Sequence, residues 1–112
     1  MKRGEVRWYT FAAPDKRRPV LILTRNSALR FLTGITIAPI TSTIRNIPSE
    51  VLLTPEEDAV LTLYAVTLDN LQTVQKAHIG GQITTLSPLR MQEVEQALCF
   101  ARGMDRLLPL NN

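Results

Sequence analysis

The hydrophobic pattern of this chain changes its period once, near Ser87. Before Ser87, apolar residues form short β-branched runs or alternate with polar residues, as is typical of strands. After Ser87 they recur at the spacing of one helical face, at Met91, Val94, Leu98 and Ala101. Ser87 suits a helix cap, Pro88 suits the first helical position, and Gly103 ends the helix. Because such a helix is not stable alone, we expect a mainly β protein with a C-terminal α-helix that closes a small barrel.

Five to seven short strands are expected before Ser87, and the segments that read as strands are 5–11, 20–24, 35–40, 50–53, 65–68, 71–74 and 82–85. Pro39 places its strand at an edge, a bulge or a strand end, because proline has no amide proton to donate. Thr54 and Pro55 suit the start of a short helical turn. No repeat, low-complexity tract or linker is found, so we expect one domain over residues 1–112.

Basic residues are concentrated in the first half of the chain. Residues 1–50 carry nine Lys or Arg against three Asp or Glu, whereas residues 51–112 carry four against seven. This segregation indicates a basic face for a polyanion such as nucleic acid; the alternative is that folding disperses the charges. The single cysteine, Cys99, suits a reducing compartment, and no apolar stretch is long enough to cross a bilayer. We therefore expect a cytoplasmic protein with no membrane contact.

The residue types exclude several kinds of catalytic site. His78 is the only histidine, which rules out a paired-histidine ribonuclease and a clustered His/Cys zinc site. Cys99 has no basic neighbour in sequence and reads as a structural thiol. Gly80-Gly81 lacks the Lys-Ser/Thr of a phosphate loop, and the acidic turn 56–58 is typical of a solvated surface. We expect neither a metal nor a cofactor.

Basic and hydroxyl side chains remain as candidates for chemistry. The candidates lie beside buried strands and carry groups that bind phosphate: Lys16, Arg17, Arg18, Thr41, Ser42 and Arg45. A guanidinium held in the loop before the strand at 20–24 fits two phosphate oxygens at once, which lysine cannot do. From the residues alone, this is either an anion site, catalytic or not, or an ordinary exposed loop.

Five segments carry a family resemblance: Met-Lys-Arg-Gly-Glu-Val-Arg-Trp at 1–8, Arg-Pro-Val-Leu-Ile-Leu at 18–23, Ala-Pro-Ile-Thr-Ser at 38–42, Leu-Asp-Asn-Leu-Gln-Thr-Val at 68–74, and the helix at 87–101. In this order they resemble the MazF/PemK toxin family and cover nearly the whole chain. The resemblance implies an SH3-like small β-barrel and a homodimer. It also implies a cognate antitoxin, which we expect to be acidic and partly disordered so that it complements the basic half.

The resemblance further implies the toxin of a type II toxin–antitoxin system, an endoribonuclease that cuts single-stranded RNA at selected sequences. Attack by the ribose 2′-hydroxyl would leave a 2′,3′-cyclic phosphate and a 5′-hydroxyl. Matching the family's motifs assigns the catalytic roles to Arg18 and Thr41. The residues expected to bind RNA are Lys16, Arg17, Arg25, Ser42, Arg45, Asn70 and Gln72.

Two departures from the family pattern affect these assignments. The connection before Arg18 is short, which leaves the general base open, with Asp15 and His78 as fallbacks and Arg18 as the expected proton donor. Asn70 and Gln72 stand where other members carry Gln and a basic residue, which predicts a changed base preference.

Two other functions are compatible with a barrel of this kind. One is a non-catalytic toxin that binds DNA gyrase, but its Trp-Gly-Ile C-terminus is not matched by the Pro-Leu-Asn-Asn at 109–112. The other is a barrel that only binds RNA or a protein partner. Cleavage of RNA would exclude both.

Overall fold

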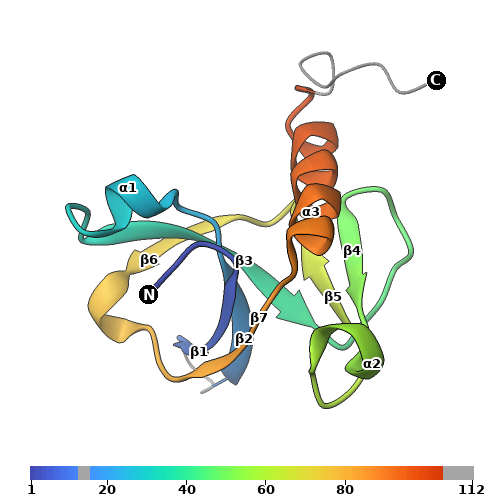
Figure 1. The fold of residues 1–112 in the computed structure, drawn as a ribbon, viewed down its shortest axis with the longest axis horizontal. Coiled ribbons are helices and arrows are strands. Elements are labelled where there is room, and N and C mark those ends of the chain that lie inside the picture. The colour runs from blue at the N-terminus through green and yellow to red at the C-terminus, as the bar shows by residue number, and fades with distance from the viewer. Residues whose placement is uncertain (13–15, 105–112) are drawn as a thin grey trace.

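One antiparallel sheet, curled into a half barrel, forms most of the protein (Figure 1). The computed structural model describes residues 1–12 and 16–104. The strands are β1 (Glu5–Phe11), β2 (Lys16–Ile22), β3 (Gly34–Thr41), β4 (Glu50–Leu53), β5 (Tyr64–Thr67), β6 (Gln72–Gln75) and β7 (Gln82–Thr85). Their order is β4-β5-β3-β2-β1-β7, and β6 pairs with β3 off this path. The prediction of a mainly β fold with a closing C-terminal helix is confirmed.

The strand β3 changes its pairing partner at Pro39, from β6 to β5, and this change positions the site described below. The first half of β3 pairs with β6, through Ile37 opposite Gln72, and its end pairs with β5, through Ile40 opposite Val66. Pro39 lies between the two partners, so its missing amide proton breaks no ladder bond. The Pro39 carbonyl accepts a 2.8 Å hydrogen bond from the buried hydroxyl of Thr67. Of the three predicted positions, an edge, a bulge or a strand end, only the last fits: β3 is not an edge strand, and Pro39 lies two residues before Thr41, where β3 ends.

Two apolar clusters fill the two faces of the sheet. The larger cluster lies between the sheet and helix α3 (Pro88–Ala101), and it includes Leu53, Val66 and Val94. The smaller cluster lies inside the curl and includes Val20, Ile22 and Ile37. Because the sheet is covered on one face and curled on itself on the other, both faces of β2 and β3 are buried over most of their length.

Helix α3 begins as its sequence predicts. The Ser87 hydroxyl accepts a hydrogen bond from the Arg90 amide at 3.1 Å, with Pro88 in the first turn. The short helix α2 (Pro55–Asp58) is capped in the same way by Thr54. Asp58, only 4% exposed, accepts two 3.0 Å hydrogen bonds from the Arg90 guanidinium and so ties α2 to α3. None of the helices in the described part of the chain is long and apolar enough to span a membrane.

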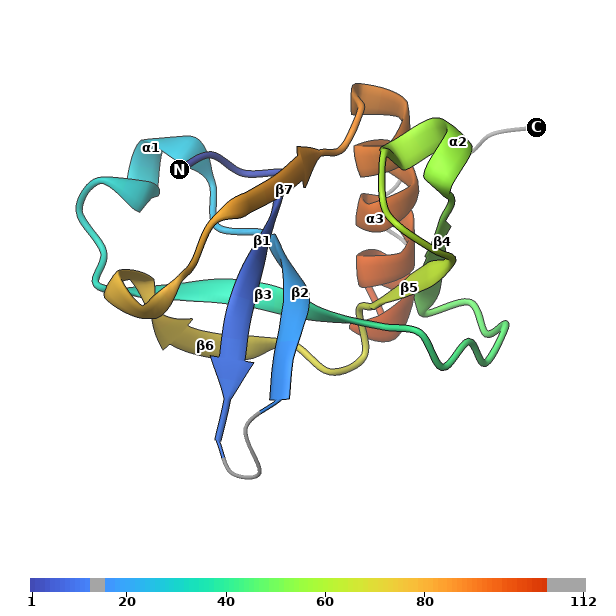
Figure 2. The same ribbon diagram turned by 90° about the horizontal axis from the view of Figure 1, so that it is seen from below.

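Two short elements have no clear sequence signal, the helix α1 (Asn26–Leu29) and the 3₁₀ turn η1 (Lys76–His78). They lie together at the end of the half barrel away from α3 (Figures 1 and 2). The strand β2 also begins earlier than predicted, because its pairing with β1 continues to Phe11 opposite Lys16. The prediction that residues 16–18 lie in a loop is therefore wrong, because all three residues lie in β2.

Candidate active site

Arg18 and Thr41 come together at the end of the β2–β3 pair. The pairing of β2 with β3 ends at Val20 opposite Pro39, and Arg18 and Thr41 each lie two residues beyond this pair on their own strands. Both residues line one hollow of about 430 Å³. Arg18 continues the row of Val20 and Ile22 inside the curl, and it has no ion pair with another described residue. Its guanidinium is therefore available to an anion in this hollow.

The Thr41 hydroxyl is oriented by the backbone that follows it. Its oxygen accepts a hydrogen bond from the Thr43 amide at 3.0 Å, closing a local turn. A hydroxyl has one proton to donate besides the lone pairs that it offers. The Thr41 proton thus remains free for an oxygen of a bound anion, and Thr43 lines the same hollow.

A second hollow of about 290 Å³ adjoins the first one. Arg18, Pro39 and Asn70 line both, so the two form one groove between residues of β2, β3 and the start of β6. The other residues of the second hollow are Phe11, Ala12, Lys16 and Gln72. Here the structure brings together four predicted residues from distant parts of the sequence, Lys16, Arg18, Asn70 and Gln72.

Asp69 is a site residue that the sequence prediction missed. It is the one carboxylate that lines either hollow of the groove among the described residues. Hydrogen bonds from Arg45 hold its pKa below the ordinary value, more than burial raises it. Its position directly before Asn70, in the turn from β5 to β6, is the sequence signal that places it here.

Arg45 lines the groove but its guanidinium is already engaged by two carboxylates. It donates to Glu50 at 2.7 Å and to Asp69 at 2.9 Å. These hydrogen bonds raise the pKa of Arg45, and the hydrogen bonding to Asp69 raises it more than the hydrogen bonding to Glu50. Arg45 therefore acts here as a cross-link between the loop after Thr41 and the β5–β6 turn, rather than as a free cation for RNA.

Several predicted residues lie outside the groove. Arg17 alternates with Arg18 along β2, so it points to the opposite face, where its guanidinium carbon lies 4.3 Å from the centre of the Trp8 ring. Arg25 caps the start of α1, and Ser42 is exposed; neither lines the groove. His78, one fallback for the general base, lies in η1 and does not line it either. The other fallback, Asp15, lies outside the described residues.

Folding also neutralises part of the basic half of the chain. Of its nine cations, Arg3 pairs with Glu95, Arg7 with Glu5, and Arg45 with Glu50 and Asp69. Lys16, Arg17 and Arg18 form no ion pair with a described residue. Lys2, Arg25 and Arg30 likewise form no ion pair with a described residue, and of these six cations only Lys16 and Arg18 line the groove.

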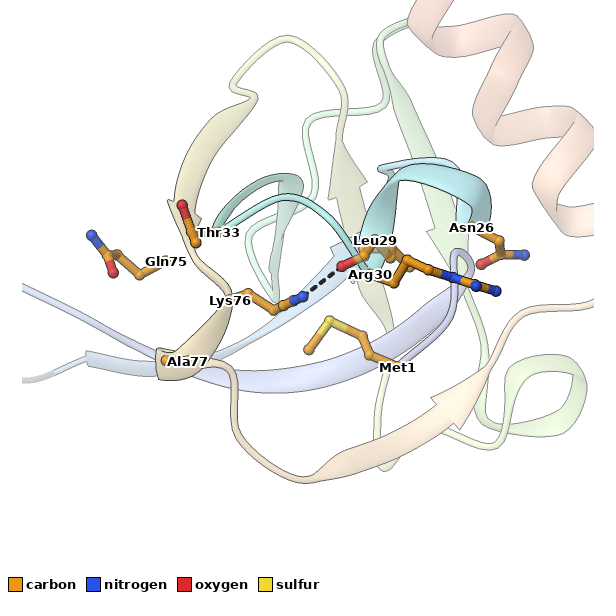
Figure 3. A pocket seen from close by; sticks show the side chains of 8 residues that line it. All are labelled: Met1, Asn26, Leu29, Arg30, Thr33, Gln75, Lys76 and Ala77. Carbon is orange, nitrogen blue, oxygen red and sulfur yellow. Dashed lines mark hydrogen bonds between the residues drawn. The ribbon is translucent and has the colours of Figure 1, made fainter.

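A larger hollow of about 720 Å³ lies between α1, η1 and the N-terminal segment (Figure 3). Two of its polar side chains, Lys76 and Asn26, hold parts of the fold together. The Lys76 amine donates to the carbonyl of Leu29 at 2.5 Å, and the Asn26 side chain accepts from the Arg3 amide at 2.7 Å. Nowhere in residues 1–12 and 16–104 do three His, Cys, Asp or Glu side chains gather as metal ligands. The groove at Arg18 is therefore the better candidate for chemistry.

Comparison with known proteins gives a consistent result. Residues 2–101 match the family model described as PemK-like, MazF-like toxin of type II toxin-antitoxin system. Probable endoribonuclease MazF5 of Mycobacterium tuberculosis is 38% identical over 104 residues, covering 93% of this chain and 94% of its own.

Solved structures agree with this match. The Mycobacterium tuberculosis toxin MazF-mt6 superimposes with a TM-score of 0.81 at 32% identity, covering 90% of this chain and 98% of that one. An endoribonuclease in complex with its cognate antitoxin, from a mycobacterial species, superimposes with a TM-score of 0.82 at 29% identity and covers 99% of both chains.

Proposed function

This chain belongs to the PemK-like, MazF-like toxins of type II toxin–antitoxin systems, and on that premise we propose that it is an endoribonuclease that cleaves single-stranded RNA in the groove at Arg18 and Thr41. The observation that carries the proposal is one hollow lined by the guanidinium of Arg18, which has no ion pair with a described residue, and by the oriented hydroxyl of Thr41. The endoribonuclease names of its relatives support it. Lys16, Asn70 and Gln72 contact the RNA beside the scissile phosphate.

Arg18 and Thr41 bind the two non-bridging oxygens of that phosphate. The planar guanidinium donates to both oxygens, and the Thr41 hydroxyl adds a directed hydrogen bond to one of them. Negative charge on these oxygens grows as the pentacoordinate transition state forms, so both donors bind the transition state more strongly than the substrate. Each such donor contributes a factor of about 100 or more to the rate.

The reaction itself needs one proton removed and one donated. The 2′-hydroxyl oxygen bonds to phosphorus and the bond from phosphorus to the 5′-oxygen breaks, which yields a 2′,3′-cyclic phosphate and a 5′-hydroxyl. Asp69, the carboxylate of the groove, accepts the proton of the 2′-hydroxyl. Arg18 protonates the leaving 5′-oxygen. Because DNA has no 2′-hydroxyl, it binds without reacting.

The setting of this activity follows from the same family. The curled sheet is an SH3-like barrel, residues 1–112 act as one domain, and two copies form a homodimer in the cytoplasm. Its inhibitor is a cognate antitoxin, as in the mycobacterial complex. An acidic, partly disordered segment of that antitoxin covers the groove cations Lys16 and Arg18, which form no ion pair with a described residue.

The proposal is tested by incubating the purified protein with long single-stranded RNA in excess chelator and mapping the new ends. We expect 5′-hydroxyl and 2′,3′-cyclic phosphate ends. The same RNA with 2′-deoxyribose at the cut position should bind but stay intact. Intact RNA in the first case, or 5′-phosphate ends, would contradict the proposal.

A further inference from the structure

The second hollow of the groove has the composition of a base-reading pocket. It shares Arg18, Pro39 and Asn70 with the hollow that holds Thr41. A nucleotide whose phosphate lies between Arg18 and Thr41 therefore has a neighbouring base over the second hollow. At about 290 Å³, open on one side, this hollow has room for a single base.

Phe11 supplies a fixed aromatic surface in this hollow. The Tyr9 ring meets it edge to face, with 4.9 Å between centroids and 77° between planes. Both rings also pack against the apolar cluster inside the curl, so Phe11 is half-buried and held from behind. A held ring next to a phosphate site is a stacking platform for an unpaired base.

The polar groups of the hollow are rich in donors. Lys16 is the cross-strand partner of Phe11 on the same face, and an ammonium only donates. The side-chain amides of Asn70 and Gln72 each donate and accept, and no carboxylate lines this hollow among the described residues. Neither amide is bonded to another described side chain, so both are available to a ligand.

These donors match one class of base edge. Uracil and guanine present a carbonyl oxygen beside a ring N–H, whereas cytosine and adenine present an amino group beside a bare ring nitrogen. Lys16 donates to the carbonyl oxygen while the Gln72 amide oxygen accepts from the ring N–H. An amino group facing Lys16 would put two donors against each other.

Building on the proposed cleavage of RNA, we propose that this hollow selects a keto base, uracil or guanine, next to the cut. Phe11 stacks on the base, and Lys16 and Gln72 read its edge. Asn70, which lines both hollows, holds the nucleotide between the base and its phosphate.

The test measures kcat/KM for RNA oligonucleotides that differ only in the base at each position next to the cut. At one of these positions we expect kcat/KM to be about tenfold higher with uracil or guanine than with adenine or cytosine, because one good contact to a base edge discriminates by about this factor. Separate substrates for each of the four bases then show which keto base is chosen. Lys16→Glu should reverse the preference toward the amino bases, because a carboxylate accepts from an amino group.

Matched variants separate recognition of the base edge from general binding of RNA. Lys2→Glu makes the same charge change on an exposed residue outside the groove and should keep the wild-type ratio. Gln72→Leu should bring the keto-to-amino ratio close to one. Phe11→Ala should weaken binding of every base by about tenfold without changing the ratio, and Phe11→Tyr should restore binding.

The same base preferences are also measured as ratios of binding affinity, with RNA that carries 2′-deoxyribose at the cut position and cannot be cleaved. The pocket is thus tested even if no cleavage occurs. Loss of cleavage alone overturns the proposed function. An unchanged base ratio in both Lys16→Glu and Gln72→Leu overturns the keto-base pocket.

Discussion

Arg18 and Thr41 line the same hollow, each two residues beyond the last pair of strands β2 and β3, Val20 opposite Pro39. Each residue is held by main-chain pairing of its own strand, Arg18 opposite Tyr9 of β1 and Thr41 opposite Ala65 of β5. A site on rigid strands keeps its donors in place while charge develops, which is how preorganised donors accelerate a reaction.

Thr41→Val tests the hydroxyl. Valine keeps the β-branched shape that suits the strand, so the fold should be retained and only the donor lost. We expect the rate of RNA cleavage to fall about 100-fold with little change in melting temperature. Ser42→Ala, a change at an exposed neighbour that does not line the groove, should leave the rate unaltered. Equal rates for the two variants would remove Thr41 from the mechanism.

The pH profile tests Asp69 as the base. Hydrogen bonds from Arg45 lower the pKa of Asp69, so the carboxylate stays ionised above its ordinary pKa of about 4 and is lost only as the pH falls through the lowered value. The rate should therefore show no acid limb between about pH 5 and pH 7. An acid limb within this range would contradict Asp69 as the base.

Arg45 is a positioning residue for Asp69, and Arg45→Met removes its hydrogen bonds while keeping an apolar stem. The pKa of Asp69 should then rise toward its ordinary value. The acid limb of the cleavage rate should accordingly move to higher pH, in addition to any fall in the plateau. A profile of unchanged shape would show that Arg45 has only a structural role.

The pairing of Asp58 with Arg90 tests how the helices are held. The Asp58 side chain is 2% exposed, and Arg90→Met leaves its charge buried without its partner. We expect the free energy of unfolding in urea to fall by about 3–5 kcal/mol. Glu95→Gln, which breaks the exposed pair with Arg3, should cost less than about 1 kcal/mol. Similar losses in the two variants would contradict this difference in burial.

Local sequence patterns predicted most of the fold because they reflect local physics. The helical spacing after Ser87, the alternation in 5–11 and the proline at position 39 each act over a few residues. Helix α1 was missed because four residues are too few to show a period. The start of β2 was missed because its pairing partner, β1, decides it and three consecutive charges resemble a loop.

The site was predictable in its central residues but not in its surroundings. Arg18 was identified by a motif, yet the separation of Arg17 onto the opposite face depends on where the strand begins. Arg45 was expected to bind RNA because it follows Thr41 in the same loop. The Asp69 carboxylate that engages Arg45 lies 24 residues away in the sequence, and only folding brings the two side chains together.

The most direct measurement compares Arg18→Ala with Arg17→Ala in the RNA cleavage assay. Both variants remove one arginine from the same strand and the same net charge, but only Arg18 faces Thr41 across the groove. We predict a loss of at least about 100-fold for Arg18→Ala and a rate near wild type for Arg17→Ala, with both proteins folded. Equal losses in the two variants, or cleavage by Arg18→Ala at the wild-type rate, would contradict the assignment of the active site.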